Sequence, residues 1–89
     1  MTIGVRKLKQ EVKTLALEIG VSAKEIHVRK MKRKWASCSS KGRLTFSTDL
    51  LSQTEDFRRR AMVHELLHMR YPNHGKMFNL LLASYSEKK

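Results

Sequence analysis

Two histidines placed one helical turn apart constrain this chain more than any other feature of its sequence. His64 and His68 flank Glu65 in the segment H-E-L-L-H. Residues i and i+4 lie on one face of an α-helix, so two imidazoles there can converge on one metal ion. Glu65 follows the first histidine directly and therefore cannot point the same way, but it can lie alongside the metal. The segment is predicted to be a helix with a metal site on one face.

This H-E-x-x-H pattern is typical of zinc-dependent hydrolases. Catalytic zinc takes three protein ligands and keeps a fourth position for water, and His74 is the natural third ligand. It follows His68 by the same interval as in the longer motif H-E-x-x-H-x-x-G-x-x-H, although Tyr71 stands where that motif has glycine. Pro72 ends or kinks the helix, which predicts a tight loop leading to His74. We therefore expect one zinc ion per chain.

The alternative interpretation is a solvated helix that carries two histidines by chance. Gly75 and the apolar residues after it argue against that interpretation, because they supply a turn and a supporting helix where a metal site needs them.

Length and composition favour one small domain over residues 1–89. Its core is small enough that a bound metal would contribute to stability. The single cysteine, Cys38, excludes an internal disulfide and fits a reducing compartment. No apolar run is long enough to span a membrane, and no signal-peptide pattern is found. We expect a cytoplasmic protein without membrane association.

The formal net charge of +11 favours acidic partners, nucleic acid among them. Two dense basic runs supply the candidate nucleic-acid contacts, namely Arg29, Lys30, Lys32, Arg33, Lys34, Arg58, Arg59 and Arg60. The alternative is an ordinary solvated basic surface. The first run falls in a predicted strand, where alternate residues face opposite sides, so it is not expected to form one continuous stripe.

Hydrophobic periodicity predicts the remaining architecture. The expected elements are a helix over 3–19, a strand over 25–36, a strand over 43–47, a helix over 53–70 and a helix over 75–86. Gly20 is expected to end the first helix, and Ser52 with Glu55 forms a capping-box signature before the fourth element. We expect the two strands to form an antiparallel hairpin, with Trp35 anchored in the core and Met77 packed inward.

Two segments resemble the YgjP-like metallopeptidases, which are relatives of the SprT-like proteases. Residues 31–46, which read M-K-R-K-W-A-S-C-S-S-K-G-R-L-T-F, are similar to that family's M-K-x-R-W-G-S-C-x-x-K-G-x-I-x-L stretch. Residues 64–78 are similar to its H-E-L-x-H, N-H-S and F-W positions. The departures are Ala36 for glycine, Ser47 for asparagine and Asn79 for the second aromatic residue. Family members commonly carry a further N-terminal β-rich portion, so we expect a minimal or truncated member.

The resemblance implies a zincin-like α+β fold. It would have an active-site helix, a following helix that bears the third ligand and a small antiparallel sheet, and periodicity adds the N-terminal helix. The same resemblance implies that His64, His68 and His74 bind zinc. Glu65 would act as general base on the zinc-bound water in the hydrolysis of a peptide or protein substrate.

Three residues near the motif are candidates for transition-state or substrate contacts: Tyr71, Asn73 and Lys76. An alternative function is a metal-stabilised, basic nucleic-acid-binding or interaction module without peptidase activity. The ligand spacing speaks against it, because closed structural zinc sites usually recruit cysteine and four ligands. A further alternative is a folded core that needs a second chain to complete its cleft.

Overall fold

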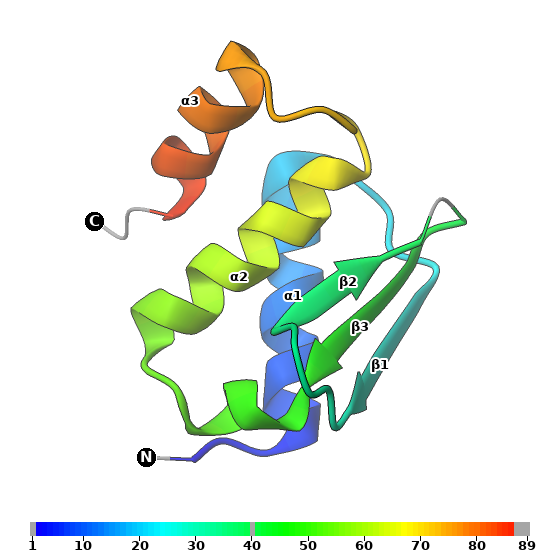
Figure 1. Cartoon of the computed structure of the whole chain (residues 1–89), viewed down its shortest axis with the longest axis vertical. Coiled ribbons are helices and arrows are strands. Elements are labelled where there is room, and N and C mark those ends of the chain that lie inside the picture. Colours follow the sequence, from blue (N-terminus) through cyan, green and yellow to red (C-terminus); the bar gives the residue numbers. More distant parts are fainter. Residues whose placement is uncertain (1, 40, 87–89) are drawn as a thin grey trace.

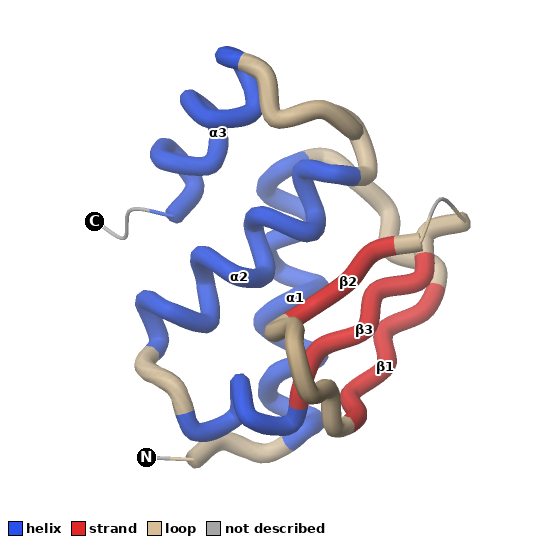
Figure 2. The backbone as a smooth tube through the Cα atoms, viewed as in Figure 1, coloured by secondary structure: helices blue, strands red, loops and turns tan. Residues whose placement is uncertain are grey.

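A computed structural model describes residues 2–39 and 41–86. The elements are α1 (Val5–Ile19), β1 (Glu25–Arg29), β2 (Ala36–Cys38), β3 (Arg43–Ser47), a short 3-10 helix η1 (Thr48–Ser52), α2 (Glu55–His68) and α3 (Lys76–Ser86). Figure 1 shows α2 between α3 and the sheet, with α1 behind it. Helices and strands occupy separate sides of the molecule (Figure 2), which confirms the α+β prediction. Among the described residues, no helix has the length and hydropathy to cross a bilayer.

The sheet has three strands in the order β1-β3-β2. The β2–β3 hairpin is antiparallel as expected, with Ser37 opposite Thr45. The prediction of one continuous strand over 25–36 is wrong, because the chain leaves the sheet after Arg29 and returns as β2. β1 consequently pairs with β3 in parallel, so the sheet is mixed rather than antiparallel. The intervening segment is rich in cations that cannot be buried on a sheet face, and it forms an exposed loop instead.

The core lies between α1, the sheet and α2, and α3 closes it at one end. Its fully buried side chains include Leu8, Val12, Leu44, Phe46, Leu50, Met62, Val63, Leu66, Leu67 and Phe78. Two predictions of burial are wrong. Trp35 is 41% exposed and packs its ring against Phe57 at the surface, and Met77 is 56% exposed because it precedes the inward-facing Phe78 by one helical position.

The helix ends that frame the site have specific caps. Gly20 ends α1 with φ 86°, a left-handed conformation that glycine adopts without strain. Thr54, not Ser52, caps α2, because the Thr54 hydroxyl accepts a hydrogen bond from the Phe57 amide at 3.2 Å. α2 thereby begins two residues later than predicted and ends at His68.

Candidate metal centre

Three histidines meet where α2 ends. His64 and His68 lie in the last turns of α2, and His74 lies in the loop before α3. One ligand atom from each ring can be chosen so that all three lie within 4.8 Å of one another. The Nε2 atoms of His68 and His74 are 2.9 Å apart.

The loop that delivers His74 is fixed by backbone hydrogen bonds. The amides of Arg70 and Tyr71 both donate to the Leu67 carbonyl, which ends α2 in a tight turn. Pro72 lies just beyond this turn and carries no amide hydrogen, so it cannot extend the helix. The Gly75 amide then donates to the Asn73 carbonyl at 2.9 Å, which folds the chain back over His68 before α3 begins.

The donor set fits zinc. Tetrahedral zinc with Zn–N bonds of about 2.0–2.1 Å places its nitrogen ligands about 3.3–3.4 Å apart. The His68–His74 pair would have to open by about 0.4 Å, and the ligand atoms that lie up to 4.8 Å apart would have to close, which small rotations of the imidazoles supply. His64 Nδ1 donates to Glu65 Oε2 at 2.8 Å, which leaves His64 Nε2 as the lone-pair nitrogen. A metal-binding imidazole typically gives its other nitrogen to a carboxylate in this way.

The electrostatic surroundings also favour metal binding. Burial is the main factor that lowers the pKa of His68, and the neighbouring His64 and His74 lower it further, while Glu65 opposes the shift. A lower pKa favours the neutral ring, which is the form that ligates a metal.

Phe78 supports all three imidazoles from the core side. Its ring centroid lies 5.4 Å from that of His64, 4.9 Å from His68 and 4.8 Å from His74, and its side chain is only 1% exposed. The sequence pattern assigned Phe78 only to the inward face of α3. Its second role depends on how α3 packs against α2, which helical periodicity does not report.

Replacing Phe78 with leucine is expected to weaken zinc affinity about fivefold to tenfold, because the edge and tilted ring contacts that hold the imidazoles are lost. The measurement is competition with a chromophoric chelator. Leu82→Val is the matched control, since Leu82 is also buried on α3 but none of the ring contacts of the site involves it. Equal zinc affinity in the two variants would show that Phe78 acts only through the core.

A groove runs beside the histidines along β2. It has a volume of about 530 Å³ and is lined by Lys34, Ala36, Ser37, Cys38, Ser39, Glu65, His68 and Pro72. Burial raises the pKa of the Cys38 thiol, and the nearby Glu65 carboxylate raises it further, so the thiol stays protonated at neutral pH. The groove therefore brings an edge strand, a carboxylate and a candidate metal ligand to one surface.

The sequence predicts no residue of β2 as a site residue, and the three predicted contacts do not line the groove. Tyr71 is half-buried against the core, with the Arg70 guanidinium 6.0 Å from its ring centre. Asn73 and Lys76 are exposed on either side of His74 in the sequence.

Two of the eight candidate nucleic-acid contacts are engaged within the fold. Arg58 is 5% exposed and bonds bidentately to Glu11, so the prediction that it contacts nucleic acid is wrong. Arg59 donates to the Tyr85 carbonyl at 2.6 Å and pairs with Glu18 at 3.3 Å. Arg60 and the five cations between residues 29 and 34 remain exposed.

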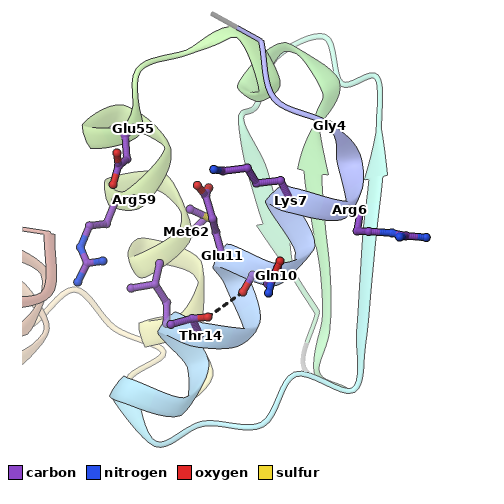
Figure 3. Close-up of a pocket in the computed structure, with 10 residues that line it drawn as sticks. Gly4, Arg6, Lys7, Gln10, Glu11, Thr14, Glu55, Arg59 and Met62 are labelled. Carbon is purple, nitrogen blue, oxygen red and sulfur yellow. Dashed lines mark hydrogen bonds between the residues drawn. The ribbon is translucent and has the colours of Figure 1, made fainter.

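A hollow of about 630 Å³ also lies between α1 and α2, away from the histidines (Figure 3). Its lining includes Lys7, Glu11, Glu55 and Arg59, and the Thr14 hydroxyl at its edge donates to the Gln10 carbonyl at 3.0 Å. It contains no histidine and no cysteine, so it is not the metal centre.

Comparison with known proteins agrees with this geometry. The crystal structure of the metallopeptidase zymogen of Methanocaldococcus jannaschii jannalysin is 27% identical, with a TM-score of 0.81 over 91% of this chain and 83% of that one. The metallopeptidase zymogen of Pyrococcus abyssi abylysin is 20% identical and shares the fold, with a TM-score of 0.74 over 84% and 75% of the two chains. No curated protein matches the sequence significantly. The family model described as YgjP-like, metallopeptidase domain, matches residues 4–88, and the chain therefore belongs to the YgjP-like metallopeptidase family.

Proposed function

We propose that this protein hydrolyses peptide bonds with one zinc ion per chain. His64, His68 and His74 would hold the zinc, and Glu65 would act as the general base. The observation that carries the proposal is the convergence of three imidazole ligand atoms within 4.8 Å, beside a groove lined by the Glu65 carboxylate.

Zinc held by three imidazoles supplies Lewis acidity, which makes water nucleophilic near neutral pH and polarises a carbonyl group. Glu65 accepts a proton from the attacking water and delivers it to the leaving amine. Its Oε2 accepts the hydrogen bond from His64, so the other carboxylate oxygen is the one available for this transfer. His64 thus orients the base while serving as a ligand.

β2 is suited to hold the substrate. It lies at the edge of the sheet and lines the groove on the side opposite α2. Its unpaired backbone groups can add an extended peptide as a further strand, which fixes the direction of the peptide and presents one of its carbonyl groups to the histidines. β2 has only three residues, so the ladder it offers is short and side-chain contacts must add to the affinity.

The metal assignment is tested by His68→Ala. The zinc content of the purified protein is expected to fall from about one ion per chain to below about one-tenth, because two remaining imidazoles do not provide the three ligands of such a site. Elemental analysis measures it. His27→Ala is the matched control, because His27 is an exposed histidine in β1 that is not part of the cluster. Zinc content that stays the same in His68→Ala would refute the ligand assignment.

A further inference from the structure

The loop between β1 and β2, together with the last residue of β1, is a cluster of unpaired positive charge. We call residues 29–34 the basic loop. Five of its six residues are cations, and all five are exposed. Among the described residues, none of the five forms an ion pair, and the carboxylate of Glu25 in β1 is already bound to Arg43 at 2.8 Å. The fold gains no internal ion pair from this charge, so the charge is available to a ligand.

The basic loop lies next to the groove beside the histidines. It surrounds a hollow of about 560 Å³ that also includes Ser37 and Thr45, which are paired across β2 and β3. Lys34 and Ser37 line both this hollow and the groove, so the two are adjacent at the start of β2. The backbone holds this junction in place, because the Ser47 amide donates to the Trp35 carbonyl at 2.8 Å.

The other end of β2 is also positive. A third hollow, of about 440 Å³, shares Ser39, His68 and Pro72 with the groove and is lined by Lys24 and Lys41. Glu65 is the single carboxylate residue among those that line these three neighbouring hollows. A chain lying along β2 would therefore meet cations at both ends and the Glu65 carboxylate in the middle.

We infer that the substrates are acidic polypeptide segments, bound in extended form along β2 with Asp or Glu side chains held by the basic loop. This inference rests on the proposed peptidase function. Lys34 and Cys38 line the same groove as Glu65 and lie four positions apart in the sequence. The selected acidic side chain thus lies a few residues from the bond that is cut.

A peptide explains the placement of the cations better than a nucleic acid does. A nucleic-acid strand would carry a phosphate past the Glu65 carboxylate at every step, whereas a peptide can place its Asp or Glu side chains at the cations and a neutral residue beside Glu65. Two of the three arginines of α2 that would widen a nucleic-acid surface, Arg58 and Arg59, are held by Glu11 and Glu18. The one aromatic side chain beside the basic loop, Trp35, already has the Phe57 ring at 4.8 Å against it.

The test compares matched peptides with glutamate or glutamine at each position within four residues of a common cleavage site. For wild type, kcat/KM is expected to be about fivefold to tenfold higher with glutamate than with glutamine at one of the outer positions, which is the scale of one or two exposed charge pairs. The ratio of the two kcat/KM values should shrink as salt rises, because salt screens exposed charges. Lys34→Glu is expected to invert the preference toward peptides with lysine at that position. The control is Lys13→Glu, which makes the same charge change on an exposed residue of α1 and should keep the wild-type ratio.

Binding of the same peptides to Glu65→Gln protein separates this inference from the proposed function. If wild type cleaves no peptide, but the glutamate peptide binds Glu65→Gln protein more tightly than its glutamine partner and loses this advantage when Lys34→Glu is added, the hydrolase proposal fails. The preference of the basic loop for acidic peptides then stands on its own. A ratio near one, or a ratio that Lys34→Glu leaves unchanged, overturns the inference. It is also overturned if Lys34→Glu abolishes binding of an oligonucleotide while peptide preference is absent, because the basic loop would then serve nucleic acid.

Discussion

Replacing Glu65 with glutamine is expected to lower peptide cleavage at least about a hundredfold while zinc content and folding stay as in wild type. The amide keeps the size of the side chain, and its oxygen can still accept the hydrogen bond that His64 Nδ1 now donates to Oε2. What disappears is the ability to take a proton from water. Cleavage of an unfolded protein and elemental analysis, carried out on the same preparation, measure both quantities.

Retained zinc is essential to this experiment, because it excludes collapse of the metal site as the cause of lost activity. Glu25→Gln is the matched control, since Glu25 is an exposed carboxylate on β1, the strand furthest from the groove. The comparison should include peptide binding, which does not depend on turnover. Equal cleavage by wild type and Glu65→Gln would remove the general-base role.

Glu11→Ala is expected to destabilise the fold by about 3 kcal/mol, because it leaves the buried Arg58 guanidinium without its counter-charge. Arg58 donates from Nε and Nη2 to the two Glu11 oxygens at 3.1 and 3.0 Å, and from Nη1 to the Gln53 carbonyl at 2.9 Å. The hydrogen bond to Glu11 is the main factor that raises the pKa of Arg58. Even without that bond a guanidinium stays protonated in a protein, so Arg58 cannot lose its charge to escape the penalty. This loss is a large fraction of the free energy of unfolding of a small domain, which is about 5–15 kcal/mol.

Urea unfolding with and without zinc measures this effect. Glu18→Ala is the control: it breaks the more exposed Arg59 ion pair and should cost less than about 1 kcal/mol. The double variant Glu11→Leu, Arg58→Met should recover most of the loss, because both charges leave the interior together. A single Glu11→Ala variant as stable as Glu18→Ala would mean that water reaches the Arg58 guanidinium.

The helices and the histidine cluster could be predicted because their signals are local. Residues spaced by three and four define the apolar face of α1 and place His64 beside His68, and Pro72 with Gly75 marks the loop that returns His74. The sequence predicts all of Arg58–Arg60 as nucleic-acid contacts, yet three consecutive helical residues point in three directions. In the structure Arg58 turns toward α1, Arg59 toward α3 and Arg60 toward solvent.

The features that could not be predicted depend on packing between distant segments. The parallel pairing of β1 with β3 joins residues 18 positions apart, such as Glu25 and Arg43, and no local pattern distinguishes it from a continued hairpin. Burial of Phe78 could be read from periodicity, but its contact with three imidazoles could not. The groove likewise exists only because β2, rather than β1, lies at the edge next to α2.

The separation between the basic loop and the histidine cluster has a consequence for how such a protein diversifies. No residue between positions 30 and 35 is fully buried, so this stretch can change in length or composition with little penalty to the core. The groups that would bind metal and move protons occupy an independent block of eleven consecutive residues, 64–74. Substitutions confined to this short surface segment can therefore change the charge that a bound peptide meets, in evolution or by design, while residues 64–74 stay the same.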